Sequence, residues 1–311
     1  MVREMTSTLR IFAFFAAFVL ALGCGKEDID YSDWYDDDDK ESTETPGTGD
    51  DSGEAVEGDL RVMSFNVRYP ASTDTGEKSW SNRKKGVYAM IEAKKPMLIG
   101  VQECYISQRN DIMNNIKGYA CYGVGRDDGK DKGETTSIIY DKSLFSLKEY
   151  GTFWLTEKDI TQPNTGWDAT IKRTTTWAKL EMKSNKQQFF FVNTHLDHQG
   201  ATAKAEGLKL IKQKLDEINP AGLPVVLTGD FNEEPTSAIF NVLLMKNARN
   251  TAPKTDYSAT SNGWGSKSQT IDHIFFNNFE VLQYQTIKDR WDGVTYISDH
   301  YPIMATFNFN K

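Results

Sequence analysis

The sequence predicts an α/β protein in which stacked sheets are flanked by helices. Short apolar runs bounded by turn residues recur from residue 60 onward and outnumber the segments with helical spacing. Neither a repeat nor a second linker divides this part, which predicts one domain over residues 59–311. The 311 residues are 39% hydrophobic and 26% charged, a composition that excludes fibrous, collagen-like and wholly disordered chains.

The individual elements follow from these runs. Strands are predicted where β-branched, aromatic or other apolar residues dominate: at residues 61–67, 97–102, 136–140, 174–181, 189–194, 225–228, 272–276 and 301–309. Helices are predicted where apolar residues follow helical spacing: at residues 83–95, 108–117, 201–218 and 237–246. Because strands are many and helices few, stacked sheets fit better than a continuous doubly wound alternation.

The N-terminus predicts an export signal. Arg3 and Arg10 precede an apolar run at residues 11–22, which is too short to span a bilayer as a free helix. The run ends in Leu-Ala-Leu-Gly-Cys and resembles a bacterial lipobox, although Ala21 stands where a branched aliphatic residue is usual. We therefore expect residues 1–23 to be a lipoprotein signal peptide and Cys24 to carry the lipid that attaches the protein to the outer membrane. An ordinary cleaved signal, giving a periplasmic or secreted protein, is the alternative.

An acidic segment separates this signal from the domain. Residues 25–57 hold 14 acidic and 2 basic residues, whereas residues 59–311 hold 32 basic and 29 acidic ones, a net charge of +3. Residues 24–58 have almost nothing to bury, so they are predicted to be a disordered tether. Lys-Glu-Asp at 26–28 also resembles the short acidic signal that sends some lipoproteins to the cell surface. The weakly basic domain suits a phosphate-bearing substrate but does not by itself indicate tight binding of duplex DNA.

Polar residues interrupt the predicted strands at their ends. The chain has only four histidines, and all of them lie in these windows, which are Ser64–Arg68, Gly100–Glu103, Phe191–His198, Leu227–Asn232, Thr270–Ile274 and Ile297–Pro302. Packing alone does not require amide, carboxylate and imidazole side chains at the end of a buried strand. Their concentration at the strand ends predicts a functional site built from those ends.

The residue types indicate the chemistry. Asp230 and Asn232 are two apart, so they face the same side and could orient a water molecule and accept its proton. Glu103 and Asn66 offer the oxygen ligands that Mg²⁺ prefers, and a carboxylate-held His300 offers a cation and a proton source. The sequence contains no CxxC, HExxH or GxSxG motif, which argues against zinc and against a serine hydrolase. Metal-assisted hydrolysis of a phosphate ester is the reaction that this inventory supports.

Taken together, these residues resemble a known family. Asn66, Glu103, the Gly-Asp-Phe-Asn of 229–232, Asp272 and the Ser-Asp-His of 298–300, in that order, are similar to the motifs of the endonuclease/exonuclease/phosphatase superfamily. The resemblance covers residues 60–310 and implies a four-layered α/β/β/α sandwich of two mainly antiparallel sheets flanked by helices. It also implies an active site at the mouth between the sheets.

The resemblance implies a role for each matching residue. Glu103 would be the principal ligand of Mg²⁺, for which Mn²⁺ could substitute, with Asn66 and Asp299 assisting. Asp230 would activate or orient the attacking water beside Asn232. His300, oriented by Asp272, would stabilise the phosphoryl transition state, and His195 would contact the scissile phosphate from the other side.

Three further residues are candidates for substrate contact or support. Glu134 lies where nucleases of the family have a carboxylate that supports the histidine corresponding to His195. Arg126 and Arg173 suit phosphate clamps, although each could equally form a surface salt bridge. His198 and His273 are open between supporting the site and ordinary hydrogen bonding.

The substrate is narrowed mainly by exclusion. The sequence at residues 269–273 lacks the Trp-Cys-Asp-Arg motif of inositol polyphosphate phosphatases, and residues 229–240 resemble the corresponding run of nocturnin-like members. The first hypothesis is a phosphodiesterase, a nuclease in the broad sense, that cleaves nucleotides or short nucleic acid. The second is a phosphomonoesterase for nucleotides or sugar phosphates. The third is an inactive binding lipoprotein.

Overall fold

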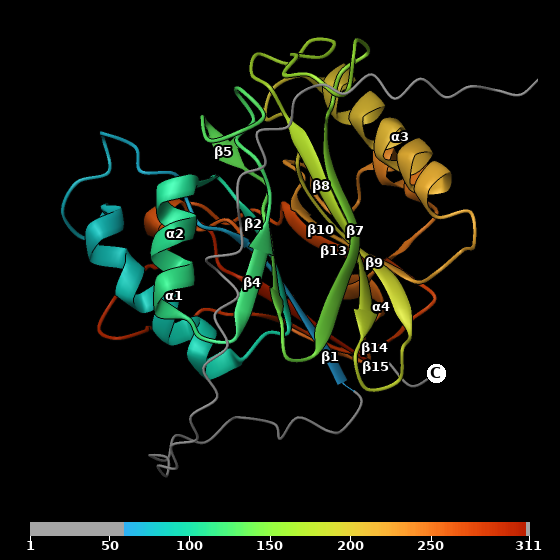
Figure 1. Cartoon of the computed structure of the whole chain (residues 1–311). Helices are drawn as coiled ribbons and strands as arrows, with labels where there is room; N and C mark the ends of the chain where they lie inside the picture. Colours follow the sequence, from blue (N-terminus) through green and yellow to red (C-terminus); the bar gives the residue numbers. More distant parts are fainter. Residues whose placement is uncertain (1–58, 309–311) are drawn as a thin grey trace, which may run out of the picture. The chain divides into compact units, whose positions relative to one another are not determined.

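The protein folds into two large sheets stacked face to face. The computed structural model describes residues 59–308 (Figure 1). In spatial order the first sheet comprises β12 (Lys254–Thr255), β14 (Glu280–Thr286), β15 (Ile303–Asn308), β1 (Asp59–Asn66), β2 (Leu98–Gln102), β6 (Ile138–Asp141) and β4 (Tyr119–Tyr122). The second comprises β11 (Lys246–Asn247), β13 (Asp272–Asn277), β10 (Val225–Asp230), β9 (Gln188–His195), β8 (Thr174–Met182) and β7 (Phe145–Trp154). A small ribbon pairs β3 (Cys104–Tyr105) with β5 (Glu134–Thr135).

Helices cover the outer faces of both sheets. The α-helices are α1 (Trp80–Lys94), α2 (Ile106–Asn115), α3 (Ala201–Ile218) and α4 (Ala248–Thr251), and the 3₁₀ turns are η2 (Gly76–Lys78), η3 (Ala238–Leu243) and η4 (Gly263–Gly265). Apolar residues of α1 and α2 pack with β1 and β2 in one cluster, and those of α3 and η3 pack with β9 and β10 in another. A third cluster fills the space between the sheets. Three apolar interfaces define four layers, so the predicted α/β/β/α sandwich is confirmed (Figure 1).

Most neighbouring strands are antiparallel, as predicted. The parallel pairs are β1–β2, β9–β10 and β12–β14. In each of the first two pairs a helix, α1 or α3, connects the strands, as parallel neighbours require. Their carboxyl ends therefore meet at one edge of each sheet, which gives four chain segments that can present side chains at the same place.

Polar groups hold the two sheets together near this edge. The Asn193 amide donates to the carbonyls of Val101 at 2.8 Å and Ser137 at 3.0 Å, and it accepts from Gln102 Nε2 at 2.7 Å. Gly100 lies opposite, and a Cβ atom there would come within 2.1 Å of Thr228 Oγ1. The sheets approach so closely at this point that only glycine fits.

One predicted helix is wrong, and several strands escaped prediction. Residues 237–246 form the 3₁₀ turn η3, and Leu244 then adopts a left-handed conformation with φ of 53°, which ends the turn before β11. Strand β7 escaped because it is an edge strand whose middle residues Lys148, Glu149 and Tyr150 are exposed. Strands β4 and β14 were also not predicted; both lie at or next to a sheet edge, where the alternation of apolar residues is weak.

The predicted signal peptide, the lipidated Cys24 and the tether lie outside the described residues. Within residues 59–308 we find no helix with the length and apolar character needed to cross a membrane.

Candidate active site

Five strand ends converge on one buried polar cluster. Asn66 ends β1, Glu103 follows β2, His195 ends β9 and Asp230 ends β10. Asp230 pairs in register with His195 on one side and with Asp272, the first residue of β13, on the other. Pairing within the second sheet brings His195, Asp230 and Asp272 together, and the stacking of the two sheets adds Asn66 and Glu103 from the first.

Glu103, Asn66 and Asp230 form the centre of the cluster. The Asn66 amide nitrogen donates to Glu103 Oε1 at 3.1 Å and to Asp230 Oδ2 at 2.9 Å. Its amide oxygen instead accepts from the backbone N–H of Arg68 at 3.0 Å. In this arrangement Asn66 orders the two carboxylates through its nitrogen, and its role as a metal ligand stays a prediction.

Three residues around the centre have left-handed backbones. The φ angles are 55° at Glu103, 58° at Arg68 and 50° at Asn232. Such conformations are uncommon for residues other than glycine and concentrate at functional sites. Here they turn the chain sharply after β1, β2 and β10.

His300 is held as a cation by Asp272. Its Nδ1 lies 2.8 Å from Asp272 Oδ2, which also accepts from Thr260 Oγ1 at 2.6 Å. Burial alone would lower the pKa of His300, but the carboxylates of Asp272, Asp230 and Asp299 outweigh it and raise the pKa to about 10. His300 Nε2 points towards Asp230, 3.9 Å from Oδ2. At neutral pH the site thus contains a fixed imidazolium.

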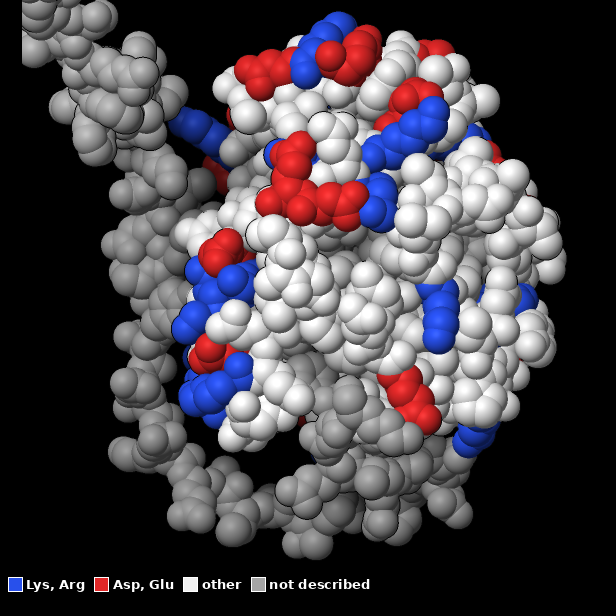
Figure 2. All heavy atoms as spheres, turned by 90° about the vertical axis from the view of Figure 1, so that its right-hand side faces the viewer, with Lys and Arg blue, Asp and Glu red and all other residues white. Residues whose placement is uncertain are grey.

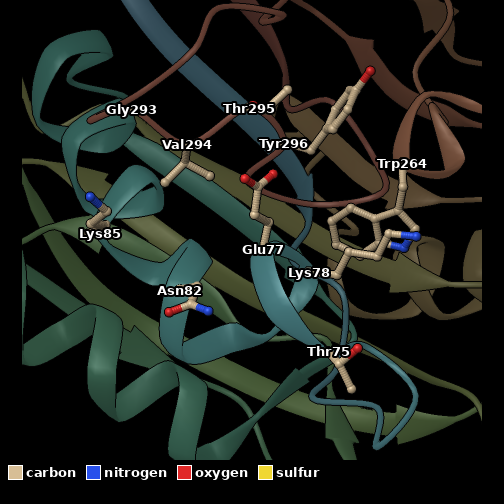
Figure 3. Close-up of a pocket in the computed structure, with 10 residues that line it drawn as sticks. All are labelled: Thr75, Glu77, Lys78, Asn82, Lys85, Trp264, Gly293, Val294, Thr295 and Tyr296. Atoms are coloured by element: carbon tan, nitrogen blue, oxygen red, sulfur yellow. The ribbon is translucent and has the colours of Figure 1, made fainter.

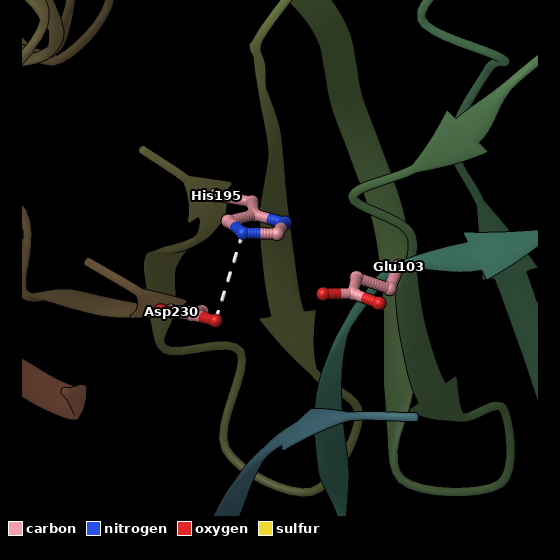
Figure 4. A group of neighbouring side chains, drawn as sticks. All are labelled: Glu103, His195 and Asp230. Carbon is pink, nitrogen blue, oxygen red and sulfur yellow. Dashed lines mark ion pairs between the residues drawn. The ribbon is translucent and has the colours of Figure 1, made fainter. Parts of the chain in front are cut away.

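His195 has the opposite character. Burial, and then the nearby Arg173 and Arg126, lower its pKa well below 6.5. Its Nε2 lies 3.3 Å from the Asn232 amide nitrogen and 3.6 Å from Asp230 Oδ2 (Figure 4). Because this imidazole is neutral, the line to Asp230 marks proximity without an ion pair at neutral pH. The two histidines flank one carboxylate in different charge states.

Asp230 is poised between these histidines. Its side chain is buried, and burial followed by the charge of Asp272 raises its pKa to about 7. Its Oδ1 accepts from the backbone N–H of Asn232 at 3.0 Å, so the carboxylate has a fixed orientation. A carboxylate whose pKa lies near neutral is suited to accept a proton from water.

The predicted support residues lie beside His195. Arg126 forms a two-pronged ion pair with Glu134, with nitrogen–oxygen distances of 2.7 and 2.8 Å. The buried Arg173 has Nε at 3.8 Å from Asp197 and donates towards His198 Nδ1 at 3.2 Å. Arg126, Glu134, Arg173 and His195 together line a recess of about 10 Å³, which has room for about one water molecule. The arginines are therefore ion-paired, but beside the site rather than on an open surface.

His273 lies outside this cluster. It is buried among Phe231, Phe240 and Phe275, and its ring nitrogens contact Asn247 Nδ2 at 3.3 Å and the carbonyl of Glu233 at 2.8 Å. It is an ordinary hydrogen-bonded core histidine.

Arg68 is a site residue that the sequence reasoning did not single out. Its Nε bonds Asp74 at 2.8 Å, while one terminal nitrogen lies 3.9 Å from Glu103 and 3.8 Å from Asp299. The available signal was its position two residues after Asn66, directly after the first strand. The carboxylates of Glu103 and Asp299 thus lie on either side of the same Arg68 nitrogen. The part of Asp299 in metal binding stays a prediction.

The donor set fits a divalent cation. Ligand atoms of Glu103, His195 and Asp230 lie within 4.8 Å of one another. Those of Asp230, Asp272 and His300 are equally close, but the protonated His300 has no lone pair for a cation. Burial raises the pKa of both Asp230 and Asp299, and the charge of a neighbouring carboxylate, Asp272 beside Asp230 and Glu103 beside Asp299, raises it further. A bound cation would relieve that repulsion, and carboxylate oxygens are ligands of hard metal ions.

Comparison with known proteins identifies the family. Residues 63–300 match the profile of the endonuclease/exonuclease/phosphatase family. The chain belongs to this family. Its members are hydrolases that act on phosphoric ester bonds with metal-dependent catalysis, so this protein is a metal-dependent phosphohydrolase.

Two solved structures from Bacteroides thetaiotaomicron are similar over nearly their whole length. One, an endonuclease/exonuclease/phosphatase family protein, is 32% identical with a TM-score of 0.76, and the match covers 81% of this chain and 98% of that one. The other, a mannosyl-6-phosphatase, is 31% identical with a TM-score of 0.74, covering 79% and 98%. Rat nocturnin is 22% identical, with 81% of this chain matching 66% of the nocturnin, slightly under two thirds of its length.

Proposed function

We propose that the protein is a Mg²⁺-dependent phosphomonoesterase that releases phosphate from phosphorylated sugars. This choice reverses the order of the two leading hypotheses from the sequence. The similarity to a mannosyl-6-phosphatase carries the proposal, both for a monoester and for a sugar as its organic group. The recess bounded by Arg126 and Arg173 has room for about one oxygen atom beside His195 and can take a phosphoryl oxygen.

The described residues would divide the reaction between them. Asp230 would orient a water molecule and accept its proton, with Asn232 fixing the carboxylate through its backbone N–H. The His300 imidazolium, held by Asp272, would donate to a phosphoryl oxygen as negative charge builds up in the transition state. Neutral His195 would contact the phosphoryl group from the Arg173 side. Mg²⁺, held by Glu103 with help from neighbouring oxygens, would supply charge neutralisation on the phosphoryl group.

The second candidate is the phosphodiesterase that acts on nucleotides or short nucleic acid. The similarity to nocturnin favours it. The net charge of only +3 over residues 59–311 argues against long nucleic acid. One face of the domain is mostly uncharged and carries small groups of Lys and Arg among Asp and Glu (Figure 2).

The test compares a sugar monoester with a diester. The full-length protein is assayed on mannose 6-phosphate and on bis-para-nitrophenyl phosphate, with Mg²⁺, Mn²⁺ or EDTA. We expect phosphate release from the monoester, dependence on the metal, and a loss of at least about a hundredfold in Glu103→Gln and Asp230→Asn. Glu149→Gln is the matched control, because Glu149 is an exposed carboxylate paired with Lys179 on strands β7 and β8.

Other outcomes would redirect the assignment. Diester cleavage at a higher kcat/KM than monoester cleavage would favour the phosphodiesterase. No turnover of these substrates or of a panel of nucleotides and oligonucleotides would leave the binding lipoprotein as the remaining hypothesis.

We also propose that the enzyme is attached to the bacterial outer membrane through lipidated Cys24. The lipobox-like sequence supports this placement, and the acidic residues that follow favour exposure at the cell surface. Incorporation of labelled palmitate that is lost in Cys24→Ser would support the anchor. Release of an unlabelled, cleaved protein would favour the periplasmic or secreted alternative.

A further inference from the structure

A second, larger cleft lies outside the active-site cluster. It has a volume of about 490 Å³ and lies between η2, the first turns of α1, the loop at residues 293–296 and Trp264 in η4 (Figure 3). Glu77 and Lys78 enter it from η2, and Asn82 from α1. None of the catalytic candidates lines it, so it is not part of the cluster described above.

Backbone contacts connect this cleft to the active-site loops. The N–H groups of Asn262 and Gly263, immediately before Trp264, both donate to the carbonyl of Asp299 at 2.9 Å. The Asn262 side chain donates to the carbonyl of Ser298 at 3.2 Å. The loop that carries Trp264, one wall of the cleft, is thus attached to the segment that carries Asp299 and His300.

Arg83 makes the same connection from the other side. It is fully buried, and its guanidinium donates to the carbonyls of Arg68 at 3.0 Å, Lys78 at 2.7 Å and Ile297 at 2.6 Å. The same guanidinium lies 5.3 Å from the centre of the Trp264 ring. One buried side chain therefore fixes both the wall of the cleft and the turn that carries Arg68 beside Glu103.

Trp264 is presented to the cleft by an unusual backbone. Its φ is 61°, and the flanking Gly263 and Gly265 have φ of 51° and 87°, so three consecutive residues are left-handed. Glycine adopts this conformation freely, whereas tryptophan does so at a cost. Arg83 supports the ring from the protein side, and the exposed Lys78 ammonium lies 5.8 Å from its centre.

The lining of the cleft has the chemistry of a sugar site. One face of a hexose carries C–H groups that pack on an aromatic ring, and Trp264 and Tyr296 supply such rings. Sugar hydroxyls need donors and acceptors on binding, which Glu77, Lys78 and Asn82 provide. The volume lies within the range of small-molecule sites.

We propose that the Trp264 cleft binds the sugar portion of the substrate whose phosphate occupies the active site. The inference rests on the proposed phosphatase function, because it assigns the organic group of the same ester. Binding energy gained here would raise kcat/KM for phosphorylated sugars over phosphate esters that have no sugar.

The experiment measures selectivity between two monoesters in the full-length protein. Values of kcat/KM are determined for mannose 6-phosphate and methyl phosphate in the wild type, in Trp264→Ala and in Thr295→Trp, which fills the cleft without removing the Trp264 ring. We expect both variants to lower kcat/KM for mannose 6-phosphate about tenfold or more and to leave methyl phosphate within about twofold. Tyr150→Ala, which truncates an exposed aromatic residue on β7, should change neither.

Several outcomes would overturn the inference. Equal losses on both esters would mean that the variants only disturb Arg83 and the active site. No loss on either ester would mean that no sugar occupies the cleft. Adenosine monophosphate is measured alongside, and a loss of kcat/KM for it but not for mannose 6-phosphate would assign the cleft to a base instead.

A binding measurement separates this inference from the proposed function. Titration with methyl α-mannoside, which has no phosphate, requires no catalysis. Binding that Trp264→Ala and Thr295→Trp abolish would support the sugar site even if no phosphatase activity were found, in which case only the proposed function would be wrong. The absence of binding in an active phosphatase, together with an unchanged selectivity ratio, would leave the function standing and overturn the sugar site.

Discussion

Replacing Asp272 by asparagine tests the electrostatic logic of the site. The substitution keeps the shape of the side chain and an oxygen that can accept from His300 Nδ1, now 2.8 Å away, and from Thr260 Oγ1. It removes the charge that does most to raise the pKa of His300 to about 10. The gap between that value and the ordinary 6.5 corresponds to about 5 kcal/mol of preference for the imidazolium.

The expected loss of activity follows from the population of the cation. Without Asp272 the pKa of His300 falls, although Asp230 and Asp299 still raise it against burial. If the pKa fell to the ordinary 6.5, only about 3% of the molecules would carry the imidazolium at pH 8, so kcat should fall by up to about thirtyfold there. A lower pH restores protonation, so the ratio of variant to wild-type kcat should rise as the pH falls from 8 to 6.

The assay is phosphate release from mannose 6-phosphate across this pH range with saturating metal. His300→Gln is the control, because it cannot regain a proton and should stay inactive at every pH. A variant kcat within threefold of the wild type at pH 8, or a constant ratio across the pH range, would refute the assignment of His300 as an Asp272-held cation.

Four further substitutions test separate parts of the structure. Glu103→Gln should weaken Mn²⁺ binding at least tenfold in calorimetric titration, and unchanged affinity would remove Glu103 from the metal site. Arg83→Met should lower the free energy of unfolding by about 3–5 kcal/mol in urea titration, because four buried carbonyl groups would lose the hydrogen bonds that Arg83 now donates to them. A loss below about 1 kcal/mol would contradict this reasoning. Gly100→Ala should cost about 2 kcal/mol or more in the same measurement, since its Cβ would collide with Thr228 and Asn193. Burial lowers the pKa of His273 to about 4, so on acidification the unfolded chain binds a proton before the folded protein does. The free energy of unfolding should therefore decrease by up to about 3 kcal/mol as the pH falls from 6.5 towards 4. His273→Gln should flatten that part of the curve of stability against pH.

The central strands could be predicted because their residues are buried on both faces. Every residue of β2 and of β10 is buried, and such strands read as continuous apolar runs. Strand β7 has three exposed polar or aromatic residues in its middle, so its sequence resembles a surface loop. Residues 237–246 show helical spacing, but the left-handed Leu244 follows from the local path into β11, which no periodicity reveals.

The sequence predicts which residues make up the site better than it predicts how their side chains contact one another. Asn66, Asp230 and His300 stand out because polar residues at the ends of buried strands are unusual. The direction of the Asn66 amide depends on the backbone N–H of Arg68, and the opposite pKa shifts of the two histidines depend on which charges face each ring. The sequence does not predict the place of Trp264 in a cleft, because a tryptophan flanked by two glycines is not typical of any known kind of binding site.

The pairing of β1 with β15 places both ends of the described fold away from the active site. Asp59 at the start of β1 lies opposite Asn308 at the end of β15, so the two ends of the described fold are neighbours. The active site begins seven residues later at Asn66, about 23 Å along the extended strand. A solid support or fusion partner joined directly at either end of the described fold would therefore attach at the end of the sheet opposite the catalytic strand ends.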